Sequence, residues 1–366
     1  MKKYCEKCVL DDSVSNFHLN EKGICNYCIE HDLSHKSYSF TADQSKDLLR
    51  KIAEQIKKDG KNKKYDCILG MSGGVDSSYV AYLAGKLNLR TLVVHVDNGW
   101  NSEIAVRNIQ KIISKLNFDL YTHVLNWEHF KDLQRAFFFS SVLDIEVAAD
   151  NAINAIVWGQ VSKHGIKHVI SGGNFATEHG LPRDWRWDKL DKRNLNHIHK
   201  LFGSKKITSH PKISNFHLLL WFRLFRNIKQ HLPLNAINYN RTEAVKLLKE
   251  EFDWKDYGGK HHESIFTKFY QSYVLPKKFN IDKRKAHLSA LIRNKEITKE
   301  IALKELSKPL YEEVDLIREK SFILKKLGFS NEDFEKIMSE APIKHDHYKN
   351  EKRIKNYIEK VKAFLK

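Results

Sequence analysis

The sequence contains no apolar run long enough to cross a bilayer. Its most hydrophobic window, "FHLLLWFRLF" at 216–225, is far shorter than the ~20 residues that a membrane-spanning helix needs, and Arg223 interrupts it. The N-terminus "MKKYCEKCVLDD" also lacks the apolar segment of a secretory signal. We therefore expect a cytoplasmic protein without a transmembrane segment. Peripheral contact of the 216–225 segment with a membrane or a partner stays open.

Internal repeats and low-complexity tracts are also absent. The chain has 366 residues, of which 42% are hydrophobic, so it can bury a substantial core in one large domain or two smaller ones. Disorder is therefore not the default expectation for this composition.

Acidic residues are scarce relative to basic ones. The chain has 63 Lys and Arg against 45 Asp and Glu, a formal charge of +18, which attracts anions. Nucleic acids, nucleotides, phosphorylated sugars and anionic membrane surfaces all fit this charge. Charge alone does not choose among them.

Cysteine is used sparingly, and four of the five cysteines form two close pairs. Cys5-x-x-Cys8 and Cys25-x-x-Cys28 are separated by 16 residues, a spacing typical of a tetrahedral thiolate site. Four thiolates leave no open coordination position, so the spacing predicts a structural Zn²⁺ in a ribbon over residues 1–40. An iron–sulfur cluster is the alternative.

Short apolar runs alternate with helix-length segments in the first half of the chain. Strands are predicted at 65–69, 91–96, 120–125 and 167–171, and helices begin near Asp76, Ser102 and Asn151. The fold class is therefore α/β, a doubly wound parallel sheet with its ligand at the carboxyl ends of the strands.

The remaining chain divides by composition. We expect a nucleotide-binding core over 41–182, a basic and aromatic insertion over 183–233 and a substrate-binding extension over 234–297. A C-terminal helical region follows over 298–366. Within these, a helix is predicted at about 241–251, and Ser330 to Asp333 reads as a capping box.

The segment "GMSGGVDSS" (70–78) lies between a predicted strand and a predicted helix. It lacks the lysine that a P-loop of kinases or GTPases requires. Its glycines allow close backbone approach, and the amides and dipole at the helix N-terminus favour an anion, so a phosphate site is expected. The alternative is an ordinary turn with a Ser or Asp cap.

"SGGVDSS" resembles the pyrophosphate loop of the PP-loop ATP pyrophosphatases, which cut ATP between its α and β phosphates. The resemblance implies that ATP and Mg²⁺ are bound and that Asp76 is catalytic, contacting a Mg²⁺-bridged phosphate. The ATP and pyrophosphate ligands that it implies are Gly70, Ser72, Gly73, Gly74, Asp76, Ser77, Ser78, His95, Asp97, Gly172 and Asn174.

A second resemblance is carried by "DWKDYGGKHHESIFTKFYQSYVLPKKFNIDKRKAHLSALI" (253–292), together with the four cysteines and the glycine loop. The combination is similar to the N-acetyl sugar amidotransferases, which contribute to O-antigen and related surface glycans. The resemblance implies that an acetamido oxygen of a nucleotide-linked diacetamido sugar is adenylated. Ammonia then displaces AMP and leaves an acetamidino group.

The residues at 257–263 are compatible with this chemistry. They combine flexible backbone, a cation, imidazoles and a carboxylate, and we expect Lys260, His261 and Glu263 to be catalytic, with His261 or Glu263 accepting a proton from the amine. Asp150 is also explained by helix N-capping. The predicted substrate-binding residues are Asp150, Glu178, Tyr257, Gly259, Lys260, Arg284 and His287.

The source of ammonia is expected to be a separate protein. Position 2 is Lys, where an N-terminal-nucleophile glutaminase needs Cys, and no length remains for a glutaminase domain of another type. We therefore predict a glutaminase subunit as partner.

The competing hypothesis is a tRNA-modifying PP-loop enzyme of the thiolation or lysidine type, which would use the positive charge directly. Thiolation generally needs a catalytic cysteine or cluster, and the unpaired Cys67 lies inside a predicted strand. A nucleic-acid partner is therefore not expected. A zinc-ribbon binding module without catalysis would leave the glycine loop unexplained.

Overall fold

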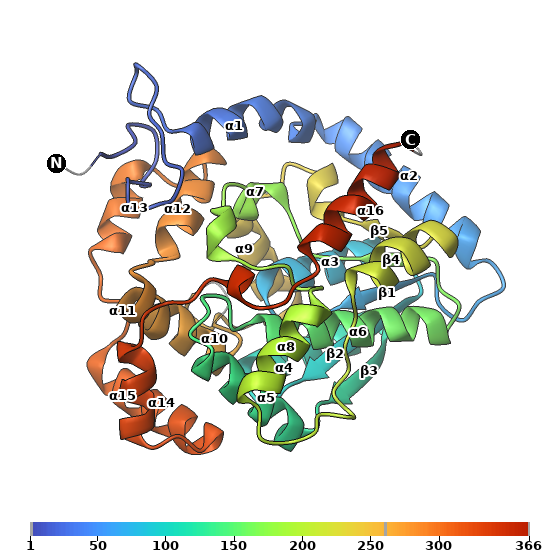
Figure 1. Cartoon of the computed structure of the whole chain (residues 1–366). Coiled ribbons are helices and arrows are strands. Elements are labelled where there is room, and N and C mark those ends of the chain that lie inside the picture. Colours follow the sequence, from blue (N-terminus) through green and yellow to red (C-terminus); the bar gives the residue numbers. More distant parts are fainter. Residues whose placement is uncertain (1–2, 260–261, 365–366) are drawn as a thin grey trace.

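The computed structural model describes residues 3–259 and 262–364, and its centre is a parallel β-sheet (Figure 1). The strand order is β3-β2-β1-β4-β5, and every pairing is parallel. The strands are β1 (Cys67–Gly70), β2 (Thr91–Asp97), β3 (Asp119–Val124), β4 (His168–Ile170) and β5 (Lys229–His231). The predicted doubly wound α/β class is confirmed. The four predicted strands are present, and sequence analysis missed β5, which lies in the predicted insertion.

Both faces of the sheet are covered by helices. Successive strand residues face opposite sides of the sheet, so they pack in different layers. Ile68 packs with the core that includes α5 (Trp127–Phe139) and α6 (Val147–Lys163). Cys67 and Leu69 pack in the opposite layer. That layer is formed by α2 (Ala42–Gly60), α3 (Val75–Lys86), α4 (Glu103–Leu116) and α9 (Arg241–Phe252).

The strand order reverses at β1, which lies between β2 and β4. After β1 the chain continues to β2 and β3 on one edge of the sheet, and after β4 it continues to β5 on the opposite edge. A crevice forms at the carboxyl ends of strands where connections diverge in this way. The segments that follow β1 and β4, at 71–74 and 171–174, therefore border the expected ligand site.

Helix starts near this edge are set by short polar residues or glycine. Ser102 Oγ accepts the Ala105 N–H at the start of α4, and Asn174 Oδ1 accepts the Thr177 N–H at the start of α7 (Phe175–Glu178). α6 begins at Val147 with Glu146 as its N-cap residue. The N-cap interpretation of Asp150 is therefore wrong, since Asp150 lies in the first turn of α6, where its carboxylate pairs with a lysine instead.

The N-terminal segment packs against the C-terminal half of the chain (Figure 1). It leads into α1 (Asn26–His35) and η1 (Lys36–Tyr38). Lys285 Nζ pairs with Asp11 at 2.7 Å, and Lys299 Nζ donates to the Cys5 carbonyl at 2.8 Å. These lysines belong to α12 (Arg284–Arg293) and α13 (Lys299–Leu306). The ribbon is thus held on two helices from the other end of the sequence.

The 183–233 segment contains η2 (Arg183–Trp185), α8 (Lys192–Phe202), the π-helix η3 (Phe216–Phe225) and β5. α8 packs on α5, and β5 extends the sheet. Among the described residues, no helix combines the length and the apolar character needed to cross a membrane.

The rest of the chain is helical, as predicted for 298–366. Ser330 and Asp333 form the predicted capping box, and α9 matches the helix predicted at 241–251. The remaining elements are η4 (Pro233–Ala236), α10 (Ile265–Phe269), η5 (Tyr270–Val274), α11 (Leu275–Phe279), α14 (Glu313–Leu327), α15 (Asn331–Ser339), η6 (His345–His347) and α16 (Lys352–Phe364).

Candidate active site

The loop between β1 and α3 has a backbone that only glycine tolerates at its centre. Gly73 has φ of +83°, and a Cβ placed there would lie 2.5 Å from the Ala105 carbonyl oxygen. L side chains disfavour this region of φ. Trp254 Nε1 donates to the Gly73 carbonyl at 3.3 Å, which fixes the loop from the opposite side.

Hydroxyl groups hold the rest of the loop at the start of α3. The Gly74 N–H donates to Ser72 Oγ at 3.2 Å, and Ser77 Oγ donates to the Gly74 carbonyl at 3.2 Å. The segment after β4 also approaches the start of α3 closely, since a Cβ on Gly172 would lie 2.9 Å from Ser77 N. The N-terminus of α3, the positive end of the helix dipole, is therefore shaped by glycines from two loops.

Asp76 is oriented by a buried tyrosine. Tyr239 donates its hydroxyl hydrogen to Asp76 Oδ1 at 2.6 Å. Burial raises the pKa of Tyr239, and the neighbouring Asp76 charge raises it further, so the phenol keeps its proton and remains the donor. Asp76 is also one of the residues that line the cavity.

The segment at 257–264 closes over the glycine loop. The Val75 N–H donates to Tyr257 Oη at 3.3 Å, and Ser72 Oγ donates to Glu263 Oε1 at 3.4 Å. Burial raises the pKa of Tyr257, and the charge of Glu263 adds to the effect. The Glu263 carbonyl accepts the Ser102 N–H at 2.8 Å, so α4 and this segment are fixed to one another.

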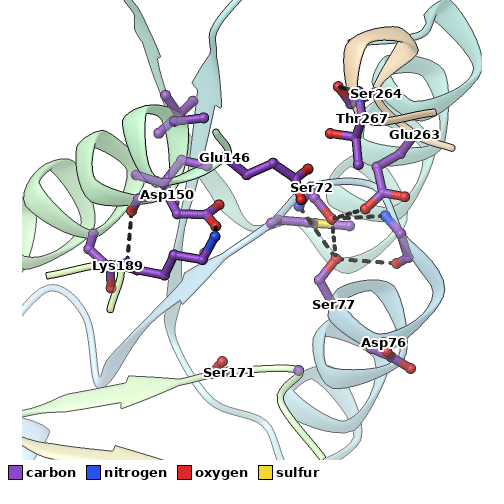
Figure 2. A pocket seen from close by; sticks show the side chains of 18 of the residues that line it. Ser72, Asp76, Ser77, Glu146, Asp150, Ser171, Lys189, Glu263, Ser264 and Thr267 are labelled. Carbon is purple, nitrogen blue, oxygen red and sulfur yellow. Dashed lines mark hydrogen bonds and ion pairs between the residues drawn. The ribbon is translucent and has the colours of Figure 1, made fainter. Parts of the chain in front are cut away.

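A charged cluster lies across the cavity from the loop (Figure 2). Lys189 Nζ lies 2.8 Å from Asp144 Oδ1 and 2.9 Å from Asp150 Oδ2. Glu146 extends into the same space, and its Oε2 lies 3.6 Å from Lys283 Nζ. Burial in the cavity raises the pKa of Asp150 even though Lys189 opposes the shift, and Glu146 contributes to the increase. Burial alone would lower the pKa of Lys189, but Asp144 and Asp150 outweigh it and raise that pKa.

The loop and the charged cluster line one cavity of about 670 Å³. Its described lining holds six carboxylates and only four Lys or Arg side chains, although the chain as a whole carries a charge of +18. A triphosphate would be repelled by this excess of carboxylates unless a cation accompanied it. The donor set, oxygen ligands beside backbone amides, fits Mg²⁺ with a nucleotide.

Two protein families match parts of this chain. Residues 45–136, which include the glycine loop, match the NAD synthase family. Residues 263–362 match the family described as "LPS biosynthesis protein WbpG-like, C-terminal domain". The two matches support the N-acetyl sugar amidotransferase family within the PP-loop superfamily. Together the two matches support a glycan-related amidotransferase, an ATP-using enzyme of the carbon–nitrogen ligase type.

Three solved structures are similar to the chain at low sequence identity. The NMN synthetase from Francisella tularensis is 16% identical, with 62% of this chain and 96% of that chain covered and a TM-score of 0.30. The NH3-dependent NAD synthetase from Campylobacter jejuni is 14% identical, covering 57% and 93%, with a TM-score of 0.29. The U34-tRNA thiolase NcsA from Methanococcus maripaludis is 15% identical, covering 82% and 91%, with a TM-score of 0.33. No curated protein matches the chain.

Most of the residues that the amidotransferase resemblance implied are brought together by the fold. The cavity lining includes residues from the glycine loop, the ends of β2 and β4, α6 and the 257–287 segment. The predicted residues found there are Gly70, Ser72, Gly74, Asp76, Ser77, His95, Asp150, Gly172, Glu178, Tyr257, Glu263 and His287.

Other predicted nucleotide ligands have structural contacts and are not among the residues that line the cavity. Ser78 is fully buried, Asp97 Oδ1 accepts the Gly99 N–H at 2.8 Å, and Asn174 caps α7. Gly73 faces Ala105, and its contribution is the shape of the loop. Their roles as ligands remain predictions.

The predicted substrate residues Arg284 and Gly259 also lie outside the cavity lining. The Arg284 guanidinium donates to Asp282 at 2.8 Å and to the Lys308 carbonyl at 2.9 Å, where it joins α12 to the end of α13. Lys260 and His261 lie outside the described residues.

Four residues of this site were not identified from the sequence: Lys189, Glu146, Asp144 and Tyr239. Lys189 lies in the basic insertion, where no local pattern separates it from the surrounding lysines. Glu146 and Asp144 precede α6 in an apolar stretch, "SSVLDIEVAAD" (140–150), and acidic residues in such a stretch were a usable signal. No pattern in the residues around Tyr239 indicates a role at the site.

The four predicted metal ligands, Cys5, Cys8, Cys25 and Cys28, converge at the base of the ribbon. All four are buried, and their sulfur atoms lie within 4.8 Å of one another. The Cys8–Cys25 and Cys5–Cys28 pairs are 3.8 and 4.0 Å apart. The cluster can hold a metal ion.

Proposed function

We propose that the protein converts an acetamido group of a nucleotide-linked diacetamido sugar into an acetamidino group, for O-antigen or a related surface glycan. The amide oxygen attacks the α-phosphorus of ATP, and pyrophosphate leaves. Ammonia then adds to the amide carbon, and the carbon–oxygen bond breaks, so that the oxygen departs on AMP. One amide, ATP and ammonia become one amidine, AMP and pyrophosphate.

One contact carries this proposal. Glu263, the first residue of the WbpG-like match, lies 3.4 Å from Ser72 in the glycine loop of the NAD synthase match. The part of the chain associated with glycan biosynthesis therefore contributes directly to the ATP-binding loop. The substrate and the nucleotide would meet in the single cavity that both parts line.

The glycine loop and the N-terminus of α3 would hold the β and γ phosphates through backbone amides. Asp76, fixed by Tyr239, would hold Mg²⁺, which neutralises charge developing on the phosphates. His95 would border the adenosine in one orientation, because its Nδ1 donates to the Met71 carbonyl and its Nε2 accepts from Asn101.

The excess of carboxylates in the cavity lining suits the step in which ammonia adds to the amide carbon. Ammonia reaches a cavity largely as ammonium, a cation that Glu146 and Asp150 would attract. Burial raises the pKa of Asp150, which brings this carboxylate closer to the task of accepting a proton. Glu263 is the second described carboxylate placed for that step. A separate glutaminase would supply the ammonia.

The four-cysteine cluster would hold Zn²⁺ with a structural role. A Zn–S bond of about 2.3 Å in a tetrahedron separates the sulfurs by about 3.8 Å. The sulfur separations of 3.8 and 4.0 Å agree with a single ion. No coordination position would remain open for substrate.

Product analysis tests the reaction. The enzyme is incubated with ATP, Mg²⁺, ammonium and candidate UDP-linked diacetamido sugars whose acetamido oxygen carries a heavy-oxygen label. We expect AMP and pyrophosphate, the label on AMP, and a sugar lighter by the difference between O and NH. Formation of ADP and orthophosphate, or pyrophosphate release stimulated by tRNA but by no sugar, contradicts the proposal.

A further inference from the structure

The π-helix η3 exposes apolar side chains while its other face is anchored in the core. Phe216, Trp221, Leu224 and Phe225 are 51, 50, 41 and 69% exposed. On the inner face Phe222 is buried, and its ring centroid lies 5.4 Å from that of Trp158 in α6. The outward residues are therefore presented on a fixed element.

This part of the chain is unusual in charge. Residues 192–242 include ten Lys or Arg and no Asp or Glu, although the whole chain has 45 acidic residues. Arg226 and Lys229 directly follow η3 and are exposed. Arg226 Nη1 donates to Ser162 at 2.9 Å, which holds this cation beside η3. We name Phe216, Trp221, Leu224, Phe225, Arg226 and Lys229 the η3 surface.

The C-terminal helix α16 adds further exposed apolar and cationic side chains. α16 packs against η3 and exposes Ile354 and Tyr357, which are 42 and 70% accessible. Arg353 is exposed on the same helix. Two elements far apart in the sequence thus combine exposed apolar side chains with cations.

The exposed apolar residues of α14 lack this combination. Val314 and Ile317 of α14 are 78 and 65% exposed, but they stand among Glu312, Glu313 and Asp315. An anionic surface would repel that site and attract the η3 surface. The contrast provides a matched control within one chain.

We propose that the η3 surface binds the anionic face of a lipid bilayer. Trp and Phe side chains partition into the headgroup region, and exposed cations are attracted to anionic lipids. A continuous cationic stretch without acidic residues matches a laterally uniform anionic surface. An individual acidic protein would instead select particular ion pairs. The protein would lie on the membrane without crossing it, in agreement with the absence of a spanning helix among the described residues.

Vesicle co-sedimentation with the full-length protein tests this inference without any need for activity. We expect binding to phosphatidylglycerol-containing vesicles, little binding to pure phosphatidylcholine, and weakening by salt because surface charges are screened. Trp221→Gln with Phe225→Gln should reduce partitioning about tenfold or more, since both rings leave the apolar phase. Val314→Gln with Ile317→Gln should bind as the unmodified protein does.

Depth-dependent quenching by brominated lipids locates the contact. Quenching of tryptophan fluorescence should fall in Trp221→Phe, a variant that retains an aromatic ring and so keeps its binding. Failure to bind anionic vesicles, equal loss in the α14 control, or unchanged quenching overturns the inference. If the η3 variants bind vesicles normally but lose a purified glutaminase subunit, the surface binds protein and the lipid proposal is wrong.

Discussion

Gly73 is the residue on which the shape of the phosphate loop depends most directly. Its φ of +83° and the 2.5 Å approach to the Ala105 oxygen leave no space for a Cβ. We expect Gly73→Ala to move the loop and abolish pyrophosphate release, measured by a coupled phosphate assay.

The matched control for that loop variant is Gly159→Ala. Gly159 lies within α6, and a Cβ there would meet no atom within 4 Å. Alanine favours the helix by about 0.5–1 kcal/mol, so Gly159→Ala should be slightly more stable and fully active. Activity that survives in Gly73→Ala would contradict the role given to the loop.

Replacement of Asp76 tests its role in catalysis separately from its role in folding. Because its carboxylate would hold Mg²⁺ and phosphate, Asp76→Asn should lose pyrophosphate release by about a hundredfold or more, in the range of a lost electrostatic group of roughly 3 kcal/mol. Tyr239 can still donate to the amide oxygen, so the melting temperature and the metal content should change little. Equal pyrophosphate release by Asp76→Asn and the unmodified enzyme would rule out this role.

A buried carboxylate of α5 contributes to its contact with α8 and the residues that follow α8. Asp132 of α5 accepts hydrogen bonds from the Ser204 N–H at 3.0 Å, Ser204 Oγ at 2.6 Å and His199 Nε2 at 2.8 Å. Burial alone would raise the pKa of Asp132, but these hydrogen bonds outweigh it and lower that pKa to about 2.

A lowered carboxylate pKa stabilises the folded state above the unfolded value, and the gain is lost as pH falls through the folded value. We expect Asp132→Asn to lower the free energy of unfolding by about 2 kcal/mol at neutral pH. The difference should shrink as pH falls from about 4 toward 2. Urea unfolding followed by circular dichroism at several pH values measures it.

Glu128→Gln is the matched control on the same helix. Glu128 also lies on α5 and pairs with Lys205, but its side chain is 58% exposed. Exposed ion pairs contribute roughly 0–1 kcal/mol, so this variant should unfold nearly as the unmodified protein does. Equal losses in the two variants would show that burial of Asp132 is not the cause.

The element scale also shows where sequence patterns failed. β5 is only three residues long, "KQH", without the apolar alternation that identifies a strand. It forms because β4 offers an open edge, and no property of residues 229–231 indicates that. Asp150 shows the opposite case, since its local pattern predicts an N-cap but α6 already begins at Val147.

At the scale of the whole molecule, the four-cysteine ribbon connects the N-terminus to both the C-terminal helices and the site. His31 of α1 stacks on Phe175 of α7, with ring centroids 5.0 Å apart, and α7 ends at Glu178 in the cavity lining. We therefore expect loss of a metal ion from the four-cysteine cluster to disturb the structure of the active site as well as that of the ribbon.

We expect Cys8→Ser, or prolonged chelation, to lower the metal content, the melting temperature and the rate of pyrophosphate release together. Elemental analysis should find zinc, and calorimetry measures the stability. Cys67→Ala provides the control, because Cys67 is buried in β1 and is not one of the clustered thiols. A Cys8→Ser protein with undiminished metal and stability would contradict the structural role.

The sequence by itself determined the α/β class, the four-cysteine cluster and the lysine-free glycine loop, because each is a local pattern of spacing and residue type. Tertiary structure alone decided that Lys189 from the insertion faces Asp150 and that Tyr239 orients Asp76. It also decided that Glu263 closes over Ser72. These residues are 39, 163 and 191 positions apart. Such contacts follow from how strands and helices pack, which no short stretch of chain encodes.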